Sequence, residues 1–204
     1  MKDDIEKLAK LFVEFPGIGE RQSRRFVYSL LARNQEYLDS LSEQIKKLRQ
    51  RIAQCEYCFR YFPADGQDLC PECGSSSTDK STLMVVEKDS DFEAIRRSKL
   101  YKGRFFILGG LVPIIDKTTP ERIRINELVA RAKSQLGEGL REIILALSLT
   151  PAGENTDRHV REKLEPIIAP HDITISSLGR GLSTGSELEY SDDDTIKNAL
   201  ENRK

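Results

Sequence analysis

Four cysteines are the residues of this chain best suited to hold a metal ion. They form two Cys-x-x-Cys pairs separated by 11 residues, and the chain contains no other cysteine: Cys55, Cys58, Cys70 and Cys73. Two such pairs supply four thiolates, the usual ligands of a closed tetrahedral Zn²⁺ site. Because protein atoms would fill all four positions, the ion would stabilise a fold and would not activate water. We therefore expect one structural Zn²⁺ per chain.

Other states of these thiols are open on the sequence alone. The four cysteines could form two disulfides, with three possible pairings, or one pair could act as a redox-active dithiol. No secretory signal precedes them, and a cytosolic protein keeps its thiols reduced. The sequence therefore favours zinc over disulfides and predicts a cytoplasmic protein.

A second group of residues, near the N-terminus, has the chemistry to bind phosphate. Gly17 and Gly19 lie in a Phe-Pro-Gly-Ile-Gly segment, and three arginines follow, namely Arg21, Arg24 and Arg25. Glycines let the backbone approach another surface closely, and the free amides at the start of a helix favour an anion. Arg21 and Arg25, four residues apart, share one helical face. We expect this hairpin to hold the sugar–phosphate backbone of DNA without reading bases. The alternative is a tight turn whose glycines serve packing only.

A third group consists of acidic residues in the second half of the chain. Glu87, Asp116 and Glu154 each follow a predicted strand. If the three acids converge outside the carboxyl ends of these strands, they form an oxygen site suited to Mg²⁺ and phosphoryl transfer. The alternative is helix capping and surface solvation. The chain has no phosphate-binding loop with a lysine and no serine or cysteine nucleophile with a recognisable base, so we assign no catalytic residue.

Hydrophobic periodicity indicates the elements that position these groups. Apolar residues recur every three or four positions in the N-terminal third, which predicts helices around residues 5–15, 20–31 and 37–52. A polar segment at 74–79 predicts a flexible joint. Short apolar runs then alternate with helical patterns, which predicts a parallel sheet with helices on both faces. The predicted strands are 83–86, 105–108, 143–147 and 173–177, and the helices are 92–97, 122–136, 154–168 and 192–201.

The predicted fold class is therefore α+β and multidomain. A helical DNA-binding hairpin region occupies residues 1–54, and a four-cysteine zinc finger occupies 55–74. An α/β domain with a mainly parallel sheet covers 80–178, and a glycine-containing loop with a closing helix forms residues 179–204.

Composition and charge set only broad limits on function. Hydrophobic residues make up 38% and charged residues 32% of the 204 residues, and no apolar run is long enough to cross a bilayer. The net charge is −1, but residues 1–54 hold 11 Lys and Arg against 8 Asp and Glu, a net of +3. The remaining residues hold 21 against 25, a net of −4. A basic N-terminal region permits polyanion binding without requiring it.

The order of these parts resembles the RecR family of bacterial recombination mediators along nearly the whole chain. Residues 15–31 are similar to that family's helix-hairpin-helix, and the four cysteines resemble its zinc finger. Residues 83–177, including Leu-Gly-Gly-Leu at 108–111 and Asp116, are similar to its Toprim domain. Residues 181–190 are similar to its C-terminal signature.

The resemblance implies a non-enzymatic protein of recombinational DNA repair, associated with the nucleoid. It implies a ring-like homotetramer that clamps single- or double-stranded DNA and helps RecO and RecF to load RecA. It places Arg21 and Arg25 among the residues that face DNA. It places Glu87 and Asp116 among the Toprim acids that contact a partner, chiefly RecO.

Two positions depart from the family pattern. The 11-residue gap between the cysteine pairs is long for the family, and Ala152 stands where the family generally has the first of two acids, leaving only Glu154. Losing one carboxylate weakens a Mg²⁺ site. We therefore expect a Toprim fold that binds partners, and we keep a Mg²⁺-dependent nuclease or primase-like enzyme as the alternative function.

Overall fold

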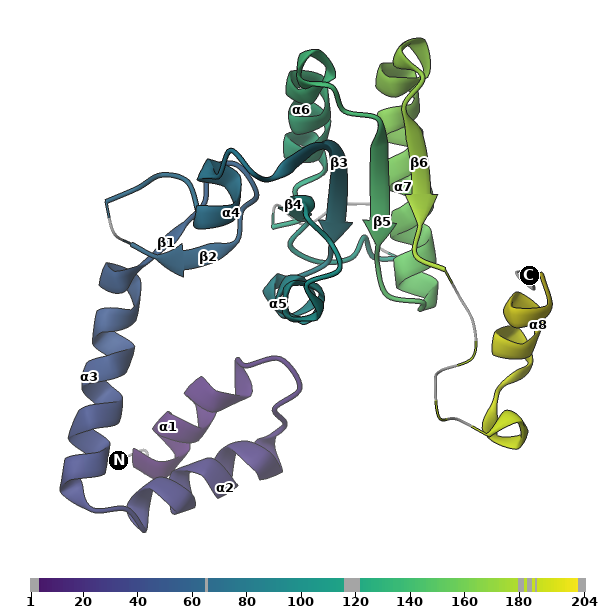
Figure 1. The fold of residues 1–204 in the computed structure, drawn as a ribbon. Coiled ribbons are helices and arrows are strands. Elements are labelled where there is room, and N and C mark those ends of the chain that lie inside the picture. The colour runs from purple at the N-terminus through teal and green to yellow at the C-terminus, as the bar shows by residue number, and fades with distance from the viewer. Residues whose placement is uncertain are drawn as a thin grey trace. The chain divides into compact units, whose positions relative to one another are not determined.

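The computed structural model describes residues 4–64, 66–115, 122–179, 182, 185 and 187–201 (Figure 1). The chain forms two compact units. The first comprises Met1–Ala53 with Pro63–Asp65, and the second comprises Gln54–Phe62 with Gly66–Lys204. The cysteine segment thus belongs mainly to the same unit as the α/β domain.

The first unit contains three helices, as the sequence predicts: α1 (Asp4–Val13), α2 (Glu20–Leu31) and α3 (Gln35–Arg51). Helices α1 and α2 pack as a hairpin, in which the rings of Phe12 and Phe26 lie 5.7 Å apart, edge to face. No residue of α3 is buried within this chain, so most of its apolar side chains are exposed.

Two short strands and one helical turn surround the cysteines. Strands β1 (Ile52–Gln54) and β2 (Tyr61–Pro63) pair as a two-stranded sheet, and α4 (Pro71–Gly74) follows. The sequence analysis did not predict these strands, because three residues are too few to reveal an alternating pattern.

The second unit is built on a four-stranded parallel sheet, which confirms the predicted fold class. Its strands are β3 (Asp79–Val86), β4 (Gly103–Ile107), β5 (Glu142–Ala146) and β6 (Thr174–Ser177). They lie side by side in the order β4-β3-β5-β6 (Figure 1), and all three pairings are parallel. Their carboxyl ends therefore meet at one edge of the sheet.

Helices cover both faces of this sheet, again as predicted. Helices α6 (Ile125–Gln135) and α7 (Pro151–Ile168) pack against one face, where Leu128 and Leu164 are fully buried. Helix α5 (Asp89–Ser98) packs against the other face through Phe92. Alternate residues of β3 enter the two cores, which is the expected pattern for a strand buried on both sides.

Smaller elements complete the unit. Among the described residues of the unit they are three 3₁₀ turns, η1 (Leu136–Glu138), η2 (Ala169–His171) and η3 (Leu188–Tyr190), and a closing helix, α8 (Asp193–Glu201). Much of the glycine-containing loop at 179–186 lies outside the described residues. In the part of the chain that the structure describes, no helix is both long enough and apolar enough to span a bilayer.

The polar segment before β3, predicted as a flexible joint, makes several internal hydrogen bonds. The Thr78 hydroxyl donates to the carbonyl of Glu72 at 2.6 Å, and the hydroxyls of Ser75 and Ser77 lie 2.8 Å apart. The bond from Thr78 ties the second cysteine pair to the start of the strand that follows.

Candidate functional site

The four cysteines converge into one cluster whose geometry suits a metal ion. Their sulfur atoms all lie within 4.8 Å of one another. The sulfurs of Cys58 and Cys70 are 3.7 Å apart. A tetrahedral zinc site with Zn–S bonds of about 2.3 Å places its sulfurs about 3.8 Å apart. Among the described residues, this is the only cluster of three or more Cys, His, Asp or Glu side chains that could hold a metal.

The backbone around the cysteines positions the sulfurs. The amide of Phe59 donates to the carbonyl of Cys55 at 2.9 Å, and Phe59 itself has a left-handed φ of 63°. The amide of Cys70 donates to the sulfur of Cys55 at 3.4 Å. Cys55, Cys58 and Cys70 are buried and Cys73 is half-buried, so the cluster is closed to solvent on most sides.

The electrostatics of the thiols also favour a cation. Hydrogen bonds from Cys58, Cys70 and Cys73 lower the pKa of Cys55. The pKa of Cys58 is raised by its hydrogen bond with Cys55, since a second negative charge beside the first is unfavourable. All four cysteines are free in the structure. A divalent cation would replace the shared protons and satisfy all four sulfurs.

The first cysteine pair is anchored to the α/β domain by Tyr57. The guanidinium of Arg131 stacks 3.4 Å from the centre of the Tyr57 ring. The Tyr57 hydroxyl accepts hydrogen bonds from Arg104, at 2.5 Å, and from Gln135, at 3.0 Å. Burial raises the pKa of Tyr57, so the phenol stays neutral. Strand β4 also contacts the first cysteine pair directly: the amide of Ile107 donates to the carbonyl of Cys58 at 2.9 Å.

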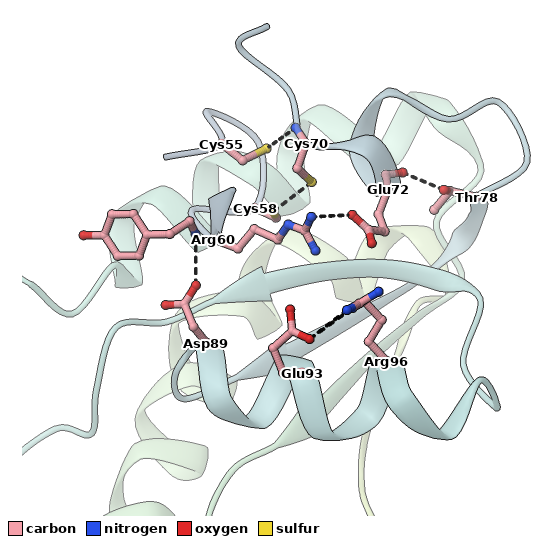
Figure 2. Close-up of polar contacts among 10 residues, drawn as sticks. Cys55, Cys58, Arg60, Cys70, Glu72, Thr78, Asp89, Glu93 and Arg96 are labelled. Atoms are coloured by element: carbon pink, nitrogen blue, oxygen red, sulfur yellow. Dashed lines mark hydrogen bonds and ion pairs between the residues drawn. The ribbon is translucent and has the colours of Figure 1, made fainter. Parts of the chain in front are cut away.

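The second cysteine pair is linked to the same domain through Arg60. Figure 2 shows Arg60 extending between the cysteines and Glu72, with helix α5 below. Its guanidinium lies 2.8 Å from the Glu72 carboxylate and 4.6 Å from the centre of the Phe92 ring. Nearby, the Asp89 carboxylate accepts a bond from the amide of Tyr61 at 2.9 Å. The cysteine centre is therefore an integral part of the α/β unit.

The predicted phosphate-binding hairpin forms in the first unit. Gly17 has a φ of +77°, a conformation that favours glycine, and Gly19 is the N-cap of α2. No side chain caps this helix, so its first amides have no partner within the helix. A Cβ atom at either glycine would meet nothing within 4 Å among the described residues. The hairpin tip therefore leaves room for a ligand beside free amides.

The three arginines of α2 differ in how free they are. Arg24 pairs with Glu6 of α1 at 3.1 Å. Arg25 makes one long bond, of 3.4 Å, to the side-chain oxygen of Gln22. Arg21 makes no side-chain hydrogen bond or ion pair within the described part of the chain. All three are exposed, so Arg21 and Arg25 are the more available for an external phosphate.

The predicted acids are only partly described. Glu87 follows β3 directly, with a side chain 18% exposed and 3.9 Å from the ammonium of Lys88. Glu154 lies in the first turn of α7, after the neighbouring strand β5. Asp116 lies outside the described residues, so the convergence of three acids remains a prediction.

The surroundings of Glu154 are closely packed. The Thr156 hydroxyl donates to the carbonyl of Ala152 at 2.7 Å and accepts from the amide of Val112 at 2.8 Å. This bond fixes the loop after β4 on the start of α7. The cavity at this edge measures about 30 Å³ and is lined by Glu154, Asp157 and Ser177, among others, which is room for one or two water molecules.

Comparison with known proteins identifies the family. Residues 81–178 match the model of the Toprim domain, and residues 181–204 match "RecR, C-terminal". "Recombination protein RecR" of Phenylobacterium zucineum is 36% identical over 201 residues, which cover 98% of this chain and 96% of the relative. The proteins of the same name from Methylorubrum populi and Paracoccus denitrificans are 36% and 33% identical, over 98% and 99% of this chain and 94% and 96% of theirs. The chain belongs to the RecR family.

Membership of the RecR family confirms the resemblance seen in the sequence. The match to the C-terminal model begins at residue 181, where the sequence analysis placed the RecR signature. The four-cysteine cluster is compatible with the expected zinc site.

Sequence reasoning missed the residues that attach the cysteine centre to the Toprim domain of this RecR-family chain. Tyr57 and Gln135, whose side chains bond directly, are 78 positions apart. The one available signal was an aromatic residue, Tyr57, between the two cysteines of the first pair.

Proposed function

We propose that this RecR-family chain is a DNA-binding mediator of recombinational repair that acts as an oligomeric clamp and adaptor without catalysing a reaction. The hairpin of the first unit holds DNA phosphates through its open glycine turn and through Arg21 and Arg25. The observation that carries the proposal is the uncapped start of α2 beside two glycines with open space around them.

The zinc part of the proposal rests on the cysteine cluster. Cys55, Cys58, Cys70 and Cys73 would hold one Zn²⁺, which would supply folding free energy and no chemistry. Because Tyr57 attaches the cluster to β4 and α6, and Arg60 attaches it to α5 through Phe92, the ion would stabilise the whole α/β unit.

The oligomer is supported by exposed apolar surface on α3. Ile45 and Leu48 are 64% and 60% exposed, and no residue of this helix is buried. Apolar side chains at this spacing form a stripe suited to another helix. A homotetramer that encircles DNA would cover surfaces of this kind.

The Toprim domain would recruit RecO and RecF and so assist the loading of RecA on single-stranded DNA. Its carboxyl edge carries Glu87 and Glu154, and the same edge exposes apolar side chains. Ile115 is 96% exposed and Leu149 is 66% exposed. Acids next to exposed apolar residues suit a protein partner with a basic and apolar surface.

Two observations argue against the alternative of a Mg²⁺-dependent enzyme. Among the described residues, the cavity beside Glu154, about 30 Å³, is not lined by Glu87, so these two acids do not share one pocket. Ala152 also lacks the carboxylate that a second metal ligand would need.

The test combines binding and turnover in one experiment. Wild-type protein is mixed with labelled single- and double-stranded oligonucleotides of unrelated sequence, at low and at moderate salt. Mg²⁺ is present at about 5 mM, so that a Mg²⁺-dependent activity would be seen. We expect retarded, intact DNA of every sequence and weaker binding at higher salt. Cleavage of the DNA, or its extension when nucleoside triphosphates are added, that is lost in Glu87→Gln would establish the enzyme. The absence of binding at low salt would exclude the clamp.

A further inference from the structure

A second concentration of positive charge lies in the Toprim domain, at the turn between α5 and β4. Four exposed basic residues occur within seven positions: Arg96, Arg97, Lys99 and Lys102. No acidic residue occurs between positions 94 and 115. We propose that this basic turn, residues 96–102, is a further contact for nucleic-acid phosphates, distinct from the hairpin. The proposal rests on DNA binding by the chain and adds a second place where it occurs.

Most of the charge in the basic turn is not neutralised within the protein. Glu93 accepts two bonds from Arg96, at 2.9 and 3.2 Å (Figure 2), and its backbone carbonyl accepts a bond from Arg97. Arg97, Lys99 and Lys102 form no ion pair in the described ranges of the chain. Basic residues in the last turn of a helix interact well with its dipole, which accounts for Arg96 and Arg97. Lys99 and Lys102 lie beyond the helix, so the dipole does not account for them.

The backbone at Lys99 is unusual for a lysine. This residue is the C-cap of α5 and has a left-handed φ of 58°, a position that glycine normally occupies. A lysine at such a position has a conformational cost that glycine would not have, and this cost points to a use for the side chain. The use that fits an exposed, unpaired ammonium is contact with an external anion.

The basic turn is also held in a defined shape. The Ser98 hydroxyl donates to the carbonyl of Ile95 at 2.7 Å and accepts from the amide of Leu100 at 3.3 Å. The Tyr101 hydroxyl donates to the carbonyl of Arg104 at 2.9 Å. The lysines are therefore presented from a fixed backbone, which lowers the entropy lost on binding.

Leu100 adds an apolar group to this charged surface. Its side chain is 88% exposed and lies directly after Lys99. Apolar side chains beside phosphate-binding cations can contact unstacked bases in nucleic-acid complexes. Charge together with an exposed leucine favours a single strand, whose bases are accessible, as the ligand of the basic turn.

The decisive variant is Lys99→Gly, which removes the positive charge and places a glycine at a left-handed φ that glycine adopts readily. Its thermal unfolding midpoint should equal or exceed that of the wild type. Its affinity for a labelled 30-nucleotide single strand in 0.1 M salt should fall about fivefold, because one phosphate contact contributes about 0.7 to the salt slope. Lys99→Gly with Lys102→Gln should lose about 25-fold and flatten the slope by about 1.4.

Lys163→Gln is the matched control, because Lys163 is an exposed lysine of α7, away from the turn. Its affinity and slope should stay at the wild-type values. If the double variant of the basic turn binds with wild-type affinity and slope, the turn is not a nucleic-acid contact. The same result together with lost binding of an acidic peptide such as polyglutamate would make it a protein site and overturn the proposal.

The test also separates this proposal from the proposed function. If Arg21→Ala with Arg25→Ala abolishes binding while the turn variants bind normally, the basic turn is excluded and the hairpin stands. If the wild type does not bind the strand at all, both proposals fail.

Discussion

Removal of one oxygen atom, by Tyr57→Phe, tests whether the cysteine centre and the Toprim domain form one unit. The phenylalanine ring can still stack under Arg131, so the change isolates the hydroxyl. That hydroxyl accepts one bond from the charged Arg104 and one from Gln135, a residue with 0% exposure. Loss of the acceptor leaves the buried amide of Gln135 without its partner. Arg104 keeps its ion pair with Glu138, at 2.7 Å.

The expected cost follows from these two bonds. A hydrogen bond to a charged group contributes about 1.5–3 kcal/mol, and leaving a buried polar group unpaired costs about 1–3 kcal/mol. Because Arg104 remains paired with Glu138, we expect a loss of about 2–3 kcal/mol in the free energy of unfolding. For a unit of this size each kcal/mol lowers the midpoint by about 2–4 °C, so the midpoint should fall by about 4–12 °C.

The assay is thermal and urea unfolding of zinc-loaded protein, followed by circular dichroism. Tyr61→Phe is the control, since Tyr61 is 61% exposed, and it should change stability by less than about 0.5 kcal/mol. In a Gln135→Met background, Tyr57→Phe should cost at least about 1 kcal/mol less, because the buried amide is gone. Equal stability of Tyr57→Phe and wild type would refute the attachment of the cysteine centre through this residue.

Three further predictions concern metal, packing and pH. Elemental analysis of Cys58→Ser should find well below one zinc ion per chain, against one in the wild type, and the variant's unfolding midpoint should be lower. Wild-type protein that contains no zinc when purified without chelators would contradict the metal assignment. Gly153→Ala should cost about 3 kcal/mol, because the new Cβ would come far closer than 3.0 Å to the backbone carbonyl of Ser148; Gly137→Ala, with open space around it, is the control and should be nearly neutral. Burial raises the pKa of Tyr101 above the ordinary value of 10.0. Burial of the neutral Tyr101 phenol therefore stabilises the fold fully below about pH 10, and this stabilisation is lost as the pH rises further. Tyr101→Phe should make the fall of the free energy of unfolding at alkaline pH less steep. An unchanged pH profile would show that Tyr101 does not contribute.

Much of this fold follows from local sequence patterns. The spacing of the cysteine pairs predicts one metal cluster, because few residues lie between them and the chain must turn back at each pair. Helices α1 to α3 and strands β3 to β6 are long enough, or apolar enough, for periodicity to reveal them. The hairpin turn is readable because Pro16 and Gly17 exclude a continuous helix there.

What the sequence could not reveal depends on contacts between distant residues. Arg24 looks as free as Arg21 in the sequence, yet Glu6 of the preceding helix neutralises it. Tyr57 meets Arg131 only after the sheet has formed. The left-handed backbone at Lys99 has no local signal, because the residue there is not a glycine.

The proposed function depends most on the contact of Arg21 and Arg25 with DNA phosphates at the hairpin. The measurement that tests it is the affinity for one labelled duplex, determined by fluorescence anisotropy for the wild type and for the double variant Arg21→Ala with Arg25→Ala. The salt concentration is varied from roughly 50 to 300 mM, so that the slope of affinity against salt can be measured. With the hairpin still folded by circular dichroism, the account predicts weaker binding and a salt slope flatter by about 1.8. Wild-type affinity and slope in the folded double variant would contradict it.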